Sequence, residues 1–151
     1  MGDYDVRVLL QIFILKIQTL CTHHQIGLEV ALPEQTTKIR CDAEILNFRV
    51  LGNLSDNAIR HTPPGGNIHL GVEQREDKVI LFIRNTGGDP IPPEKIPTIF
   101  DRGTQGNGNA GLAGLGLFNV AQAMEAHGGK VWVESSKEEG TTFFLQFPSV
   151  A

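Results

Sequence analysis

One long amphipathic segment constrains the fold of this chain more than any other feature. Asp42 is well suited to cap a helix, and the breaker PPGG at residues 63–66 must end one, so the sequence predicts a helix from Asp42 to about Arg60. At about 100° per residue its apolar positions share one side. They are Leu46, Val50, Leu51, Leu54 and Ala58. Such a helix needs a second layer against which to bury that side.

Two asparagines lie at the margin of this apolar side. Asn53 and Asn57 are neighbours on the helix surface, and Arg60 lies just outside them. An amide at the edge of a core is costly to bury unless it is hydrogen-bonded. The two amides therefore either bond neighbouring backbone groups or hold a ligand or a metal, and the segment alone leaves both interpretations open.

The rest of the chain supplies the expected second layer. Alternating or wholly apolar runs predict strands at residues 26–32, 67–74, 78–84, 130–135 and 141–147, with a short partner strand at 37–40 and a hairpin turn at 75–77. Further helices are predicted at 6–20, 94–100 and from Leu117 to the stop at Gly128. The pattern predicts an α+β fold, a two-layer α/β sandwich with a mixed, mostly antiparallel sheet and helices on one face.

Size and composition exclude several classes of protein. The 151 residues predict one domain over 1–151, and a net charge of −4 argues against a general nucleic-acid binder. Cys21 and Cys41 lack metal-site spacing and are expected to be reduced and half-buried, as in an intracellular protein. The apolar run at residues 8–15 ends at Lys16, short of the ~18 residues of a membrane span, and no signal-peptide layout precedes it. We expect a soluble, cytoplasmic chain, which also fits the cytoplasmic portion of a membrane-bound protein.

A glycine-rich segment precedes the helix at Leu117. Six glycines fall within residues 101–116, which predicts a mobile loop. Its last residues, GLAGLG at 111–116, lead into that helix, where backbone amides and the helix dipole favour a phosphate. No GK[ST] follows the glycines and no strand immediately precedes them, so the segment is neither a Walker loop nor a Rossmann fingerprint.

Four motifs occur in a characteristic order: NLSDNAIRHTPPGG, IRNTGG with IPPEKIPTIFDR, GLGL with EAHGGKVWVES, and GTTFFLQFP. Together they resemble the catalytic, ATP-binding domain of bacterial sensor histidine kinases, in the superfamily that includes Hsp90, DNA gyrase B and MutL. The resemblance covers the chain from about Asp3 to Pro148. It implies the Bergerat fold, in which ATP and Mg²⁺ lie between two long helices under a lid.

The resemblance assigns roles to residues of the first two motifs. Asn57 corresponds to the asparagine whose side-chain oxygen ligates Mg²⁺, and Arg60 to a basic residue that contacts phosphate. Asn53 occupies a position that is a glutamate general base in hydrolysing relatives, and an amide there favours transfer over hydrolysis. His61 matches an aromatic position beside the base. Arg102 matches a lid arginine that neutralises the terminal phosphate.

Later motifs supply further nucleotide-binding residues. Counted from the preceding strand, Asn85 takes the place of the family's adenine-reading aspartate, and a neutral acceptor is weaker than a carboxylate. The following loop is one residue longer than usual, so Asp89 is an alternative source of that carboxylate. Thr141 matches a threonine that reaches adenine through water, and Ile91 lines the base pocket. The remaining matches are Gly87, Gly114, Leu115, Gly116 and Leu117.

The function implied is that of a protein-histidine kinase catalytic domain in two-component signal transduction. It would transfer the γ-phosphate of ATP to a histidine on a separate dimerisation domain, with a response regulator as indirect partner. No H-E-x-x-x-P phosphoacceptor segment occurs in the sequence. The isolated domain is expected to be monomeric. Two alternatives are an anti-sigma-factor-type serine kinase and a non-catalytic nucleotide-binding or interaction module of the same fold.

Overall fold

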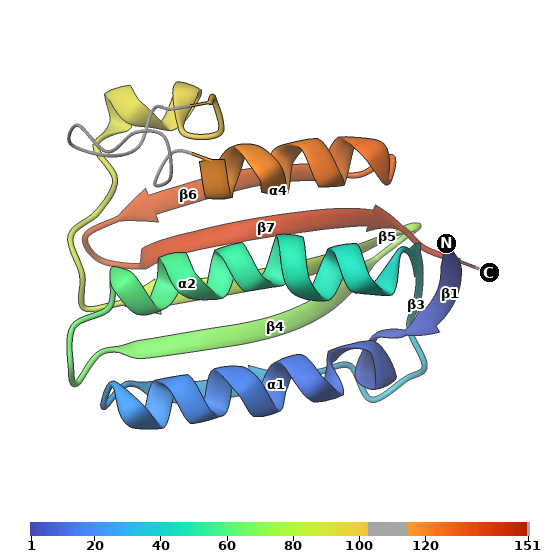
Figure 1. Cartoon of the computed structure of the whole chain (residues 1–151), viewed down its shortest axis with the longest axis horizontal. Coiled ribbons are helices and arrows are strands. Elements are labelled where there is room, and N and C mark those ends of the chain that lie inside the picture. The colour runs from blue at the N-terminus through green and yellow to red at the C-terminus, as the bar shows by residue number, and fades with distance from the viewer. Residues whose placement is uncertain (103–114, 151) are drawn as a thin grey trace.

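The computed structural model of the protein describes residues 1–102 and 115–150 (Figure 1). After the first strand and the first helix, pairs of strands alternate with helical segments along the chain. In order they are β1 (Gly2–Asp5), α1 (Val6–His23), β2 (Gly27–Ala31), β3 (Lys38–Cys41), η1 (Ile45–Leu51), α2 (Gly52–Arg60), β4 (Asn67–Arg75), β5 (Lys78–Thr86), η2 (Pro93–Thr98), α4 (Leu115–Ala126), β6 (Lys130–Ser136) and β7 (Gly140–Pro148).

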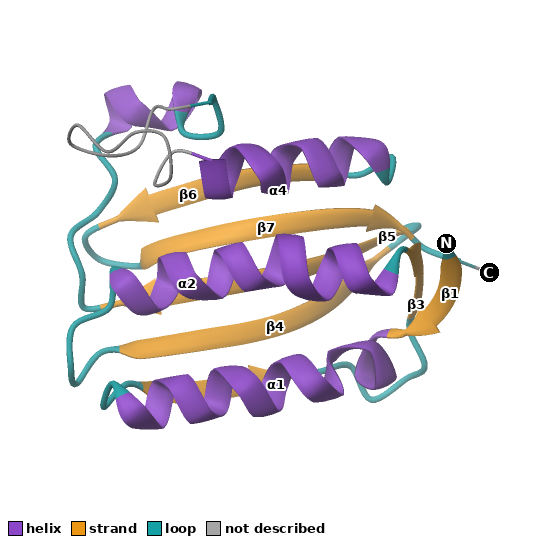
Figure 2. Cartoon of the chain, viewed as in Figure 1, coloured by secondary structure: helices purple, strands orange, loops and turns teal. Residues whose placement is uncertain are grey.

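The main sheet has five strands in the order β2-β4-β5-β7-β6. β2 runs parallel to β4, and the other neighbours are antiparallel. The helices α1, α2 and α4 all lie on the same face of this sheet (Figure 2). The predicted α+β sandwich with a mixed, mostly antiparallel sheet is therefore confirmed. Residues 78–84, which are apolar on both faces, lie in β5, the central strand.

A single apolar cluster fills the space between the helices and the sheet. The five apolar residues predicted to share one side of the segment after Asp42 all belong to this cluster, and each is at most 5% exposed. From the sheet, Val79, Leu81 and Ile83 of β5 point into the same cluster, because alternate residues of a strand share a face. The inward face of β5 thus continues directly to Asn85.

The segment predicted as one helix is wound in two ways. η1 is a π-helix, in which the Gly52 N–H bonds to the Asn47 carbonyl five residues back, and α2 continues from it as an α-helix. The Asp42 carboxylate accepts the Ile45 N–H at 3.0 Å, as expected for a helix cap. His127, which follows α4, accepts the Asp42 N–H through Nε2 at 3.0 Å and ties the two long helices together.

The N-terminal strands correct one prediction. β3 pairs antiparallel with β1, with Tyr4 opposite Ile39, and not with the strand at residues 27–31. Ile39 is fully buried and fixes this small sheet against the core. β1 has only four residues, two of them aspartates, so it carries no strand signal of its own.

Helix α1 combines a buried and an apolar exposed side. Val6, Leu10 and Ile17 are fully buried, whereas Val8, Ile12 and Leu15 are more than 60% exposed. By length and composition alone, Val6–His23 is long and apolar enough to cross a membrane, a property it shares with core helices of soluble proteins. The predicted run of residues 8–15 is therefore part of a longer helix.

The two cysteines are free thiols, as predicted, but they are buried rather than half-buried. Cys21 is 1% exposed on α1, and Cys41 is 0% exposed at the end of β3. Burial raises the pKa of both thiols, and for Cys41 burial together with the nearby Asp42 carboxylate raises the pKa to about 11.

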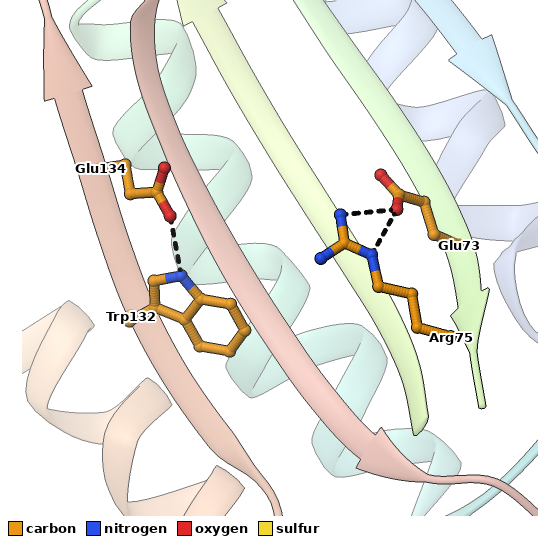
Figure 3. Close-up of polar contacts among 4 residues, drawn as sticks. All are labelled: Glu73, Arg75, Trp132 and Glu134. Atoms are coloured by element: carbon orange, nitrogen blue, oxygen red, sulfur yellow. Dashed lines mark hydrogen bonds and ion pairs between the residues drawn. The ribbon is translucent and has the colours of Figure 1, made fainter. Parts of the chain in front are cut away.

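Within residues 1–102 and 115–150, no helix lies against the other face of the sheet (Figure 2). There the Trp132 indole N–H donates to Glu134 at 3.2 Å, and Arg75 pairs with Glu73 at 2.9 Å (Figure 3). Trp132 also stacks on Phe144 of β7, with ring centroids 5.0 Å apart. These contacts lie on the open surface of the sheet. An exposed ion pair such as Arg75–Glu73 contributes little to the stability of the domain.

Candidate functional site

The predicted site residues converge at one end of the sandwich, where α2 ends and α4 begins (Figure 1). At this same end β5 and β6 finish and β7 starts, so loops and strand ends from distant parts of the chain meet. Polar side chains therefore concentrate beside an otherwise apolar core.

Three polar side chains form one row across the sheet at this end. Asn85 lies opposite Thr141, and Thr141 lies opposite Ser135, so β5, β7 and β6 contribute one residue each. All three occupy the strand positions that face the helices. The hydroxyls of Ser135 and Thr141 are 2.6 Å apart, and the Ile91 N–H donates to Ser135 Oγ at 2.9 Å. Ser135 therefore joins the sheet to the loop that follows β5.

Asn85 is the most informative member of this row. It is 7% exposed, and its side-chain amide has no hydrogen-bond partner within residues 1–102 and 115–150. Because buried amides are nearly always bonded, an unpartnered one facing a polar site favours a ligand. Asp89 is exposed on the loop beyond Gly87. The burial difference favours Asn85 over Asp89 as the base-reading residue, and that assignment stays a prediction.

The loop after β5 is held close to the end of α2 by two glycines. Gly87 has a φ of +92°, which side chains other than glycine adopt at a cost. At Gly88 a Cβ would overlap the main-chain carbonyl oxygen of His61. The loop that carries Ile91 can approach α2 this closely only because Gly88 has no side chain. Sequence reasoning assigned a role to Gly87 and missed Gly88.

The two asparagines of α2 have different environments. The Asn53 nitrogen donates to the Arg49 carbonyl at 2.6 Å, so the backbone-bonding interpretation holds for that atom. Its Oδ1 faces the first turn of α4, where a Cβ on Gly116 would lie 3.4 Å away. Asn57 is 7% exposed, and its side chain has no partner in the part of the chain that the structure describes. Asn57 thus resembles Asn85: a buried amide available to a ligand.

Basic groups lie around the end of α2. His61 follows the last turn of α2, and its backbone N–H donates to the Asn57 carbonyl at 3.1 Å. Partial burial, and secondarily the charge of Arg60, lowers the pKa of His61 below its ordinary value. The lowered pKa favours the neutral form of the ring, whereas Arg60, exposed in the last turn, carries a fixed positive charge.

Arg102 approaches α4 from the segment after η2. Its guanidinium carbon lies 5.9 Å from the centroid of the Phe118 ring, within the range of a cation–π contact. Just before it, Phe100 packs edge-to-face on Phe143 of β7 and Ile99 is buried. These apolar contacts anchor the segment that carries Arg102. The predicted mobile loop lies largely outside the described residues, as does Gly114.

The start of α4 adds backbone donors to the site. Leu115 and Gly116 are its first residues, and Leu117 is 2% exposed in the core. The first N–H groups of a helix have no acceptor within it, and the helix dipole favours an anion there. The predicted helix of this region is confirmed, and its described part includes Leu115 and Gly116 before Leu117.

Metal-binding capacity at the site is limited. Within residues 1–102 and 115–150 no group of three or more His, Cys, Asp or Glu side chains could hold a metal ion. An amide oxygen suits Mg²⁺, which usually keeps several waters and shares phosphate oxygens. The unpartnered Asn57 amide therefore fits a metal that arrives with a phosphate ligand, and the surroundings do not fit an all-protein metal cage.

Comparison with known proteins agrees with this geometry. Residues 42–151 match the family model described as histidine kinase-, DNA gyrase B-, and HSP90-like ATPase. The sensor protein SrrB of Staphylococcus aureus is 40% identical over 105 residues, which cover 66% of this chain and 18% of SrrB. The chain belongs to the histidine kinase-, DNA gyrase B- and HSP90-like ATPase family.

Solved structures agree with the fold over nearly the whole chain. The nucleotide-free catalytic domain of histidine kinase ThkA superposes with a TM-score of 0.86 at 26% identity and covers 99% of this chain and 98% of its own. The mycobacterial sensor histidine kinase MprB has the same fold, with a TM-score of 0.81 at 24% identity, covering 98% of this chain and 97% of its own. The chain is thus an ATPase domain of the histidine kinase type. It spans less than a fifth of the curated relatives that it matches.

Proposed function

We propose that this domain binds ATP with Mg²⁺ and presents the γ-phosphate to a histidine on a separate dimerisation domain of a sensor kinase. The observation that carries the proposal is the pair of buried amides, Asn57 of α2 and Asn85 of the neighbouring strand β5, which lack partners among the described residues. Neither amide is wholly enclosed by the described protein, so a ligand can reach both, and a nucleotide with its metal would supply the missing partners.

Each end of the nucleotide has matching groups in this proposal. The base lies against Asn85, Thr141 and Ile91, beside the neutral ring of His61. The phosphates lie toward Arg60 and toward the first N–H groups of α4, which include those of Leu115, Gly116 and Leu117. Asn57 supplies an amide oxygen to Mg²⁺, which when bound offsets phosphate charge. Gly87, and Gly114 by resemblance, line the same nucleotide.

Transfer is favoured over hydrolysis because the site lacks a base at the expected position. In the reaction the bond between the γ-phosphorus and the bridging oxygen breaks, a nitrogen–phosphorus bond forms on the acceptor imidazole, and ADP leaves. The Asn53 amide cannot take a proton from water, and its nitrogen is already bonded to the Arg49 carbonyl. Arg102 is placed to offset charge on the terminal phosphate as it transfers.

The setting follows from the relatives, which are sensor proteins much longer than this chain. We propose a single cytoplasmic domain over residues 1–151, monomeric when isolated. Its partner would be the dimerisation domain that carries the acceptor histidine, with a response regulator acting downstream and no nucleic acid involved. Asp89 and the serine-kinase alternative stay secondary, because no contact in the structure favours them.

Isothermal titration calorimetry with Mg²⁺–ADP and Mg²⁺–ATP tests the binding step. Wild type should bind both, and Asn57→Ala should lose the Mg²⁺ dependence of affinity while still binding ADP alone. A dimerisation domain supplied in trans should then gain acid-labile phosphate from ATP. Absence of nucleotide binding would refute the proposal, and binding without transfer would favour the non-catalytic module.

A further inference from the structure

The residue that the proposed function assigns to the nucleotide base is an amide whose neighbours on the adjacent strands are uncharged. Asn85, Thr141 and Ser135 form the polar row at this end of the sheet, and none of them carries a charge. Both Asn85 and Thr141 are 7% exposed; Thr141 is bonded to Ser135, and the Asn85 amide is not wholly enclosed, so a ligand can reach it. The base is therefore selected mainly by the hydrogen-bonding pattern of this row.

An amide can present two opposite patterns to a base edge. Its oxygen accepts and its nitrogen donates, and a half-turn about the last side-chain bond exchanges the two. Within the described residues nothing bonds the Asn85 amide, so no protein contact fixes which atom faces the base. A carboxylate at this position could only accept.

The neighbouring hydroxyls of Ser135 and Thr141 can also exchange their donor and acceptor roles. Ser135 Oγ accepts the Ile91 N–H, and either hydroxyl of the Ser135–Thr141 pair can donate to the other across 2.6 Å. If Ser135 donates, the Thr141 proton is free for the ligand; if Thr141 donates, its oxygen accepts. The whole row can therefore exchange donors for acceptors without moving a heavy atom except within the Asn85 amide.

These properties matter because the two kinds of purine differ by such an exchange. Adenine has a donor at its 6-amino group and an acceptor at N1, whereas a 6-oxopurine has an acceptor at O6 and a donor at N1. One orientation of the Asn85 amide matches adenine, and the flipped orientation matches hypoxanthine or guanine. A carboxylate has no proton to donate to O6, and a polar atom left unpaired in a buried site is strongly rejected.

We propose that Asn85 makes the site accept 6-oxopurine nucleotides as well as adenine nucleotides. This inference rests on the proposed nucleotide-binding function and specifies the base that the site selects. Asn85 is here the specificity-determining residue, and Ser135 acts through Thr141 as a positioning residue.

Calorimetry with Mg²⁺–ADP and Mg²⁺–IDP, whose bases differ only at position 6 and N1, tests the inference on the whole chain. Wild type should bind IDP within about fivefold of ADP. Asn85→Asp should bind ADP as well or better but weaken IDP so that the ratio of dissociation constants exceeds about tenfold, the cost of one unpaired buried polar group. GDP should follow IDP.

Two further variants separate this cause from others. Asn67→Asp adds the same charge at the same end of the sheet, on the face without helices, and should leave the IDP to ADP ratio unchanged. Asp89→Asn removes the alternative carboxylate and should also leave the ratio unchanged. A wild-type ratio above about a hundredfold, or a ratio that Asp89→Asn alters and Asn85→Asp does not, would overturn the inference. If wild type binds ADP tightly but does not bind IDP, only the inference about the base is overturned. If wild type binds neither nucleotide, the proposed function is refuted as well.

Discussion

Ser135→Ala is the change that most sharply separates a nucleotide site from an ordinary strand end. Ser135 accepts the N–H of Ile91, 44 residues away in sequence, at 2.9 Å, and its hydroxyl is hydrogen-bonded to that of Thr141 at 2.6 Å. Alanine removes both bonds and leaves Thr141, which is 7% exposed, without this partner. A net contribution of about 1 kcal/mol for each neutral hydrogen bond gives a total of about 2 kcal/mol.

The full loss should lower the stability of the ligand-free domain, and part of it should also weaken nucleotide binding. A loss of about 2 kcal/mol corresponds to a fall in Tm of about 4–8 °C for a domain of this size. The freed loop must also be ordered again when nucleotide binds, and if half of the loss appears there, the Kd for Mg²⁺–ADP rises about fivefold. Calorimetric titration and thermal unfolding with and without Mg²⁺–ADP measure the two parts.

A neighbouring serine provides a matched control. Ser136 accepts the Glu139 N–H at 3.0 Å in the β6–β7 turn and faces the opposite side of the sheet, so Ser136→Ala removes one hydrogen bond without touching the polar row. It should lower Tm by no more than half as much and leave the Kd unchanged. Ser135→Thr, which restores the hydroxyl, should recover ADP affinity. Equal ADP affinity of Ser135→Ala and wild type would refute the assigned positioning role.

Three further predictions follow from other contacts. Gly88→Ala should destabilise the domain by about 1–3 kcal/mol and weaken nucleotide binding, because the new Cβ meets the His61 carbonyl, and thermal unfolding and titration would detect it; unchanged stability would contradict the close packing. Since the pKa of His61 is lowered, the folded state binds fewer protons than the unfolded chain, so stability should decline as pH falls below about 6.5, and His61→Asn should lessen that decline in Tm. Since the pKa of Cys41 is raised to about 11 from 9.0, stability should be lost as pH rises from 9 toward 11, and native Cys21 and Cys41 should resist iodoacetamide at pH 8 yet react in urea.

Much of the fold follows from local patterns in the sequence. Leu46, Val50, Leu54 and Ala58 recur every four residues, a spacing that keeps them on one side of both a π-helix and an α-helix. The apolar side of this segment was therefore predicted correctly, although the prediction assumed an α-helix from Asp42 to Arg60. The central position of residues 78–84 was also predictable, since a strand that is apolar on both faces is typical of the middle of a sheet.

The features that sequence reasoning missed depend on tertiary structure. β1 is four residues long and acquires its partner only when β3 docks on the core. The role of Ser135 depends on the β6–β7 register and on a backbone N–H far away in sequence, neither of which has a local signal. Gly88 is explained only by the carbonyl of His61. In each case the role of the residue depends on a tertiary contact that the local sequence does not indicate.

The site itself was partly predictable because its side chains fall in ordered motifs. Those motifs assigned Asn57, Asn85 and Thr141 to the nucleotide, and the structure brings Asn85 and Thr141 face to face on adjacent strands. Burial then distinguishes Asn85 from the exposed Asp89, a distinction that counting along the loop could not make.

The most direct test of the account is to follow the backbone amides of the chain by NMR while Mg²⁺–AMPPNP is added. We predict saturable shifts at Asn57, Asn85, Ile91 and Thr141, with no shift in β1, β3 or the hairpin turn at Glu76, at the opposite end of the sheet. In Asn57→Ala these shifts should require much higher nucleotide concentrations when Mg²⁺ is present. Shifts that cluster elsewhere, or a wild-type spectrum that nucleotide leaves unchanged, would contradict the central claim.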